Sequence, residues 1–240
     1  MTAFFGAVLS GFLGMAGGVL LFGVMLLTGM EPVVAIPVHA AVQIMSNGTR
    51  VFALRQHVHW HRARIFVVAS LPFPALGLWI AGGLSAEAIK VSIGAMILLM
   101  FLGPRRSLAE LPERWAFGIA GVLSGTLGVV VGAFGPLLSL FFLRPDWGRH
   151  AIISTQAVVQ TWGHLQKLIA FAIVGLYDAR YRGALFADLW LVVPMALVTI
   201  LGTYVGRYLL GRLSEKQFRV IYLGVLVLLA VRLLLAPLLD

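Results

Sequence analysis

Long apolar stretches separated by short polar connections make up most of this chain. Eight stretches are expected, over residues 3–27, 33–54, 64–83, 86–103, 115–143, 150–176, 184–210 and 216–238. A helix of about 20 apolar residues crosses the hydrocarbon core of a bilayer, which is roughly 30 Å thick. The pattern therefore predicts an all-α polytopic membrane protein, with a single transmembrane domain over residues 1–240.

Composition supports this fold class and excludes several kinds of function. Hydrophobic residues make up 60% of the chain and charged residues 11%, and the mean hydropathy is +0.99. A soluble domain carries about a quarter of charged residues. The net charge of +9 comes from bases between the apolar stretches. Such bases orient a protein in the lipid bilayer and do not indicate binding to nucleic acid.

Two sequence echoes predict an internal repeat. Val8 to Gly14 reads VLSGFLG and Val122 to Gly128 reads VLSGTLG. Downstream, the segment AAVQ at residues 40–43 is answered by AVVQ at residues 157–160, which aligns Asn47 with His164 and Arg50 with Lys167. We therefore expect two related halves of four segments each: repeat one at 1–104, a connecting loop at 105–114 and repeat two at 115–240.

The distribution of basic residues favours an inverted repeat. If all eight segments crossed the bilayer, the loops would divide ten bases to seven between the two sides. If segments one and five are hairpins that enter and leave on one side, the division becomes thirteen to four. Cytoplasmic loops are enriched in Lys and Arg, so the second arrangement is preferred. It places the N- and C-termini on the non-cytoplasmic side.

Glycines provide a mechanism for these hairpins. Segment one contains glycines at positions 11, 14, 17 and 18, and segment five contains them at positions 125, 128, 132 and 135, before Pro136. Glycine costs a helix interior about 1 kcal/mol and proline about 3 kcal/mol. We expect discontinuous helices with breaks near Gly14–Gly18 and Gly128–Gly135. The alternative is that the glycines only allow helices to pack closely.

Polar side chains inside apolar segments point to an anion site. Helix N-termini at the breaks would offer N–H groups to an oxyanion. In segments two and six, polar residues recur on one helical face. The candidate substrate-binding residues are Gly17, Gly18, Gln43, Ser46, Asn47, Arg50, Gly132, Gly135, Gln160, Trp162, His164 and Lys167. Structural alternatives are interhelical hydrogen bonds for the glutamines, snorkelling for Arg50 and Lys167, and a structural role for His164.

The run His57, His59, His61 raises the question of a metal site. No carboxylate or cysteine lies close in sequence to complete one, and the chain has no cysteine. The run lies among arginines in a predicted cytoplasmic loop, where basic residues attract anionic headgroups. All carboxylates fall at or near segment ends, which disfavours catalysis within the membrane. We therefore expect no metal, no cofactor and no enzymatic activity.

Specific stretches also resemble a known family. GFLGMAGGVLLFGVMLL followed by EPVVAIPVHAAVQIMSNG, and GTLGVVVGAFGPLL followed by ISTQAVVQTWGHLQKLIAF, resemble the TauE/SafE (TSUP) family of anion permeases. The resemblance covers most of the chain. It implies export or uptake of sulfite, sulfoacetate or related organosulfonates. One departure is that segment one has fewer consecutive glycines than the Gly-rich stretch usual in the family.

Together these observations predict a multi-pass transporter in a bacterial inner membrane. We expect a secondary transporter or facilitator for small sulfur-containing anions, working by alternating access between the two repeats. An uncoupled anion channel is the alternative within transport. An intramembrane metal-dependent enzyme using His57, His59 and His61 is the alternative from a different class. If transport is coupled to an ion, His164 is suited to bind a proton. Whether the protein forms a homo-oligomer is left open.

Overall fold

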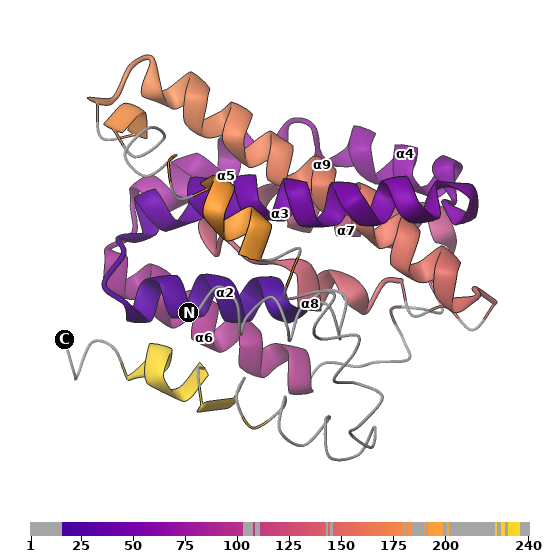
Figure 1. Ribbon diagram of the computed structural model, residues 1–240, viewed down its shortest axis with the longest axis horizontal. Coiled ribbons are helices and arrows are strands. Elements are labelled where there is room, and N and C mark those ends of the chain that lie inside the picture. Colours follow the sequence, from indigo (N-terminus) through magenta and orange to yellow (C-terminus); the bar gives the residue numbers. More distant parts are fainter. Residues whose placement is uncertain are drawn as a thin grey trace.

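The computed structural model shows an all-helical chain in the residues that it describes (Figure 1), which confirms the predicted all-α class. Those residues are 16–102, 108, 111–142, 144, 146–179, 181–183, 190, 192–198, 201, 224, 227–228 and 230–235. The helices are α2 (Ala16–Leu27), α3 (Pro32–Leu54), the 3-10 helix η1 (Arg55–His57), α4 (Trp60–Ser70), α5 (Phe73–Gly82), α6 (Ala86–Leu102), α7 (Glu113–Val130), α8 (Gly135–Ser139) and α9 (Arg149–Gly175).

Three predicted segments each form one helix. The second, fourth and sixth segments correspond to α3, α6 and α9. Helix α3 starts with Pro32, whose missing N–H is tolerated in the first turn of a helix. Most of segments seven and eight, and the first copy of the heptapeptide, lie outside the described residues.

The third segment is bent, which the sequence analysis did not predict. Helices α4 and α5 meet at an angle of 47° around Leu71 and Pro72. Proline lacks an N–H and clashes with the preceding turn, so Pro72 and Pro74 together interrupt the helix. No described helix is by itself long and apolar enough to cross a bilayer, although α4 and α5 meet these requirements jointly as a bent pair.

Two glycines of α7 allow helix backbones to approach closely. A Cβ atom at Gly121 would lie 2.5 Å from the carbonyl oxygen of Phe66, and one at Gly125 would lie 2.8 Å from that of Ser70. Both neighbours belong to α4, so α4 packs tightly along α7. For these two glycines the packing interpretation holds.

The fifth segment breaks where the glycines predicted. Helix α7 ends at Val130, α8 begins at Gly135, and Gly132 between them has a φ of 67°, which favours glycine. The chain then returns to its starting end, because Arg144 donates to the carbonyl of Leu111, just before α7. Segment five is therefore a hairpin that enters and leaves at the same end of the molecule.

Figure 1 shows two groups of helices. Helices α3, α4, α5, α7 and α9 lie together, while α2, α6 and α8 form a second group beside them. One hydrophobic core runs through the described helices, and its fully buried side chains include Phe22 of α2, Phe117 of α7 and Ile93 of α6. This packing fixes α2 and the α7–α8 break against α3 and α9.

Candidate functional site

Helices α3 and α9 run antiparallel, and this sets the geometry of the site. Near the start of α3, the ring centroid of His39 lies 5.4 Å from that of His164 in the C-terminal half of α9. Just after α3, His57 stacks on His150 at the start of α9, with centroids 5.1 Å apart. The register between these contacts brings Gln43 to the level of Gln160.

Six polar side chains line this helix pair at intervals of four residues. We call them the polar ladder: His39, Gln43 and Asn47 of α3 with His164, Gln160 and Gln156 of α9. All six are buried, none more than 8% exposed. Because the i, i+4 spacing keeps side chains on one helical face, each member meets the opposite helix at the level of its partner. Sequence reasoning had identified four members and missed His39 and Gln156.

The ladder matches itself under the sequence repeat. The repeat that aligns Gln43 with Gln160 also aligns Asn47 with His164 and His39 with Gln156. We call the two ladder residues at one level a rung. Because α3 and α9 are antiparallel, the two aligned glutamines form the central rung, and the repeat maps each outer rung onto the other. The repeat could have revealed the two missed residues. Extending the polar face by one helical turn in each half reaches His39 in α3 and Gln156 in α9.

Three ladder amides offer hydrogen-bond donors that nothing in the described part of the chain accepts. These are Asn47 Nδ2, Gln156 Nε2 and Gln160 Nε2. At Asn47 the amide orientation is fixed, because Arg50 Nη1 donates to Asn47 Oδ1 at 3.1 Å and a guanidinium only donates. Ser46 is also buried beside this face. The ladder therefore presents an excess of donors.

Lys167 connects the ladder to the α7–α8 break. Its Nζ donates to the carbonyl oxygen of Gly132 at 2.6 Å and lies 3.4 Å from His164 Nδ1. Lys167 is 4% exposed, and the buried residues of the described part include no carboxylate. A helix C-terminus leaves carbonyls that favour a cation. The carbonyl of Gly132 thus accepts from Lys167, and the N–H group that Gly132 was expected to offer to an anion stays a prediction.

Helix α2 closes the other side of the site. The carbonyl oxygen of Gly18 lies 2.9 Å from His39 Nε2, and a Cβ atom at Gly18 would lie 2.6 Å from Gln43 Nε2. Gly17 precedes Gly18 in the first turn of α2. Gly18 and Gly132 are equivalent in the heptapeptide repeat. Each gives its carbonyl to a side chain of the following polar helix.

Two further predicted residues lie apart from the ladder. Trp162 faces α4, where its indole Nε1 donates to Ser70 Oγ at 3.1 Å. Gly135 is the first residue of α8, a helix of five residues. Trp162 therefore connects α9 to α4.

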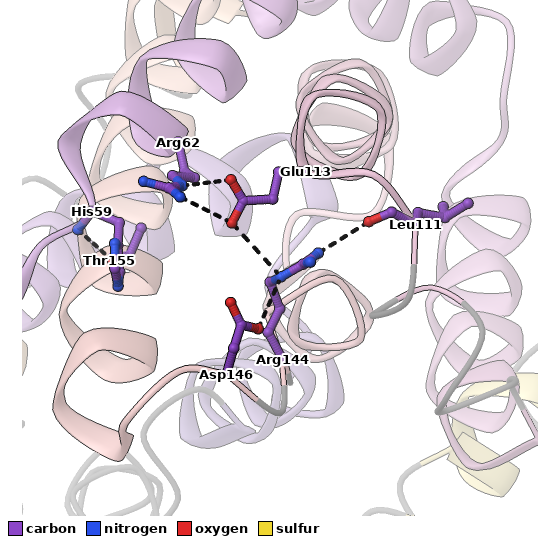
Figure 2. Close-up of polar contacts among 7 residues, drawn as sticks. All are labelled: His59, Arg62, Leu111, Glu113, Arg144, Asp146 and Thr155. Carbon is purple, nitrogen blue, oxygen red and sulfur yellow. Dashed lines mark hydrogen bonds and ion pairs between the residues drawn. The ribbon is translucent and has the colours of Figure 1, made fainter.

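At one end of the molecule a charged network joins α4, α7 and the segment before α9 (Figure 2). Arg62 donates to both carboxylate oxygens of Glu113, at 2.8 and 3.2 Å. Arg144 donates to the Leu111 carbonyl at 3.1 Å and lies 3.5 Å from the Asp146 carboxylate. We call Arg62, Glu113, Arg144 and Asp146 the end network. It ties both halves together at this end.

At the opposite end lies a pocket of about 610 Å³. It is bordered by residues around Glu31, Leu84 and Tyr181, which belong to three connections between helices. Its deep wall includes Ile36, Val129 and Phe171, each no more than 3% exposed. Phe171 follows Lys167 by four residues and Ile36 precedes His39 by three. One apolar layer therefore separates the pocket from the ladder.

Two histidines of the run stack on other aromatic rings. His57 stacks on His150, and His59 stacks on Trp147 with centroids 4.2 Å apart. Within the described residues no group of three or more potential ligands could hold a metal ion. The metal-dependent enzyme alternative thus finds no site in this part of the chain.

The sequence model of the family described as Sulfite exporter TauE/SafE matches residues 1–233. The chain belongs to the TauE/SafE family. No curated protein and no solved structure matches the chain. TauE/SafE members are membrane transporters, so this TauE/SafE protein is a membrane protein of the transporter type.

Proposed function

We propose that this TauE/SafE protein is a secondary transporter or facilitator for small sulfur-containing anions, such as sulfite, sulfoacetate or other organosulfonates. The substrate binds at the polar ladder between the two repeats. It moves by alternating access, in which the halves rock about this site.

The donor excess of the ladder carries this proposal. Buried polar groups in proteins are nearly always hydrogen-bonded, so three amide nitrogens without an acceptor among the described residues favour the binding of an acceptor there. An oxyanion only accepts hydrogen bonds. Lys167 adds a positive charge beside the ladder, and the buried described residues include no carboxylate. Arg50 donates to the ladder amide of Asn47. These features favour an anion over a cation or an apolar molecule.

The arrangement of loops supports an inverted repeat. If segment five crossed the bilayer fully, Arg144 and Arg62 would lie on opposite sides. Both lie in the end network with Glu113, as a hairpin requires. Helix α9 is the repeat equivalent of α3, and the two helices are antiparallel, which also supports an inverted repeat. We therefore place the end network on the cytoplasmic side and the pocket on the non-cytoplasmic side.

The two ends support alternating access. Ion pairs close the cytoplasmic side, while the pocket reaches within one apolar layer of the ladder from the other side. In the opposite arrangement the cytoplasmic side would be open and the other side closed. Alternation between the two arrangements would expose the ladder to each side in turn. An uncoupled channel would need a continuous path, and Ile36, Val129 and Phe171 interrupt it.

The function is tested with purified protein in proteoliposomes and a panel of radiolabelled sulfite, sulfoacetate, taurine and sulfate, with and without a pH gradient. We expect saturable uptake of at least one sulfur anion, lost in a variant with Gln43→Leu and Gln160→Leu. Flux that does not saturate would favour the channel. Absence of flux for every anion, in protein shown to be folded, would refute the proposal.

Topology has a separate test. Single cysteines replacing Arg149 and Tyr181 are labelled with a membrane-impermeant maleimide in intact cells and in inverted vesicles. The inverted arrangement predicts that position 149 reacts from the cytoplasmic side and position 181 from the opposite side. Reaction of both from one side would contradict it.

A further inference from the structure

His39 combines a fixed hydrogen bond with an unpartnered ring nitrogen. Its Nε2 lies 2.9 Å from the carbonyl oxygen of Gly18, and a carbonyl only accepts, so Nε2 carries the hydrogen. In a neutral ring Nδ1 is then an acceptor with a lone pair. Among the described residues Nδ1 has no hydrogen-bond partner. The neutral ring thus adds one acceptor to a ladder otherwise rich in donors.

The surroundings of the ring are positive or neutral. His39 is 1% exposed and packs between Phe22, at 5.1 Å, and His164, at 5.4 Å between centroids. The titratable groups that face it from α9 are His164 and Lys167. On its own helix, Arg50 lies eleven residues further along. Gly18, Phe22 and Gly132, which pack here from α2 and the break, do not titrate.

An anion at the ladder would interact unfavourably with a neutral His39. The lone pair of Nδ1 repels an oxyanion, while a proton on Nδ1 turns it into a charged donor. Without an anion, the charge of Lys167 opposes a second positive charge nearby. A bound anion offsets that repulsion. Anion and proton therefore favour each other's binding, and this coupling is reciprocal.

We propose that His39 takes up one proton at Nδ1 when the anion binds and releases it with the anion on the other side. One N–H bond forms on loading and breaks on release, and no electrons are exchanged. With a monovalent anion the loaded site gains no net charge. This inference rests on the proposed function, since it assumes that the ladder binds an anion, and it makes His39 the residue that couples anion movement to protons.

Titration calorimetry of sulfoacetate binding, near neutral pH, tests this coupling. The sulfonate stays ionised and the carboxyl titrates near 4, so the ligand exchanges no proton itself. Comparing imidazole and Tris buffers, which differ in ionisation enthalpy and are not anions, gives the number of protons taken up. We expect about one proton per anion in the unmodified protein and about none in His39→Gln, whose amide can still donate to Gly18. His57→Gln, outside the ladder, should retain the uptake.

The outcomes separate the two proposals. If neither sulfoacetate nor sulfate binds, the proposed function fails. If sulfoacetate binds without proton uptake, or if His39→Gln retains the uptake, the function stands and His39 does not couple. Loss of uptake in His164→Gln alone would also overturn the assignment. Should His39→Gln not fold, a variant in which the four histidines outside the ladder are replaced (His57, His59, His61 and His150) keeps only the two ladder histidines. Retained uptake then supports the proposal, and loss overturns it.

Discussion

Helices α3 and α9 present equivalent polar faces but hold their cations differently. In α9, Lys167 is buried and its ammonium donates to the carbonyl of Gly132 in the helix break. In α3, the equivalent Arg50 is only partly buried and donates to Asn47, a residue of its own helix. The same register thus places one cation deep in the site and the other nearer a helix end.

This difference separates two roles that the repeat alone would treat as one. A cation bonded to the break stabilises the broken backbone and supplies charge to the ladder. A cation that donates to an amide of its own helix, as Arg50 does to Asn47, orients that amide and supplies charge to the ladder. The comparison therefore predicts unequal consequences when the two cations are removed.

Replacing Lys167 should have the largest effect. Lys167→Met keeps the length but leaves the buried Gly132 carbonyl without its donor, at a cost of about 1–3 kcal/mol. Loss of a charged donor to the anion, worth roughly 1.5–3 kcal/mol, should weaken sulfoacetate binding about 10- to 100-fold. Arg50→Met should weaken binding about tenfold or less, with little change in stability. Thermal unfolding and calorimetry measure both. An equal loss of stability in the two variants would contradict the assigned roles.

Substitutions of the two glutamines in the central rung should weaken substrate binding by similar amounts. Gln43→Leu and Gln160→Leu each remove one amide donor at the level where the repeat matches itself. Each should weaken sulfoacetate affinity by about five- to tenfold, corresponding to roughly 1–1.4 kcal/mol. Ser154→Ala is a matched control, because Ser154 is buried on α9 but its hydroxyl donates to the backbone of Ala151. Strongly unequal effects of the two Leu variants would argue against a shared central rung.

The sequence could predict the features that local chemistry determines. Glycine and proline content located the α7–α8 break, and the repeat located four of six ladder residues, since both depend on residues close in the chain. The bend between α4 and α5 went unnoticed, although Pro72 and Pro74 carried the signal. The apolar pattern continues across the bend and concealed it.

Tertiary contacts were beyond the reach of sequence. Gly132 was expected to present an N–H group, yet its role depends on Lys167, which is 35 residues away in the chain. Trp162 shares α9 with the ladder, but Ser70 of α4 accepts its indole hydrogen. Tertiary packing determines which neighbouring helix contacts each face of a polar helix. A helical face alone therefore names more candidates than the site contains.

The end network should have a smaller effect than the ladder. Arg62 and Glu113 have side chains about one third exposed, at 32% and 30%. Such a pair contributes about 0.2–1 kcal/mol. Glu113→Gln should therefore raise access to the ladder from the cytoplasmic side by at most about fivefold. The labelling rate of a cysteine replacing Gln156, the α9 ladder residue nearest the end network, measures this access. Arg114→Gln, on the next residue but outside the network, should leave the rate unchanged.

Trp162 should have the smallest effect on binding, and it tests where the site ends. Trp162→Phe removes one hydrogen bond, to Ser70, worth about 1 kcal/mol, and the midpoint of thermal unfolding should fall by roughly 2–4 °C. Sulfoacetate affinity should not change, since the indole faces α4 and not α3. Ser70→Ala should produce a similar fall, and the double variant should lose less than the sum, because both changes remove the same bond. If Trp162→Phe instead weakens binding as much as Gln160→Leu does, the substrate contacts two faces of α9, and the distinction between the ladder and its supporting contacts would be wrong.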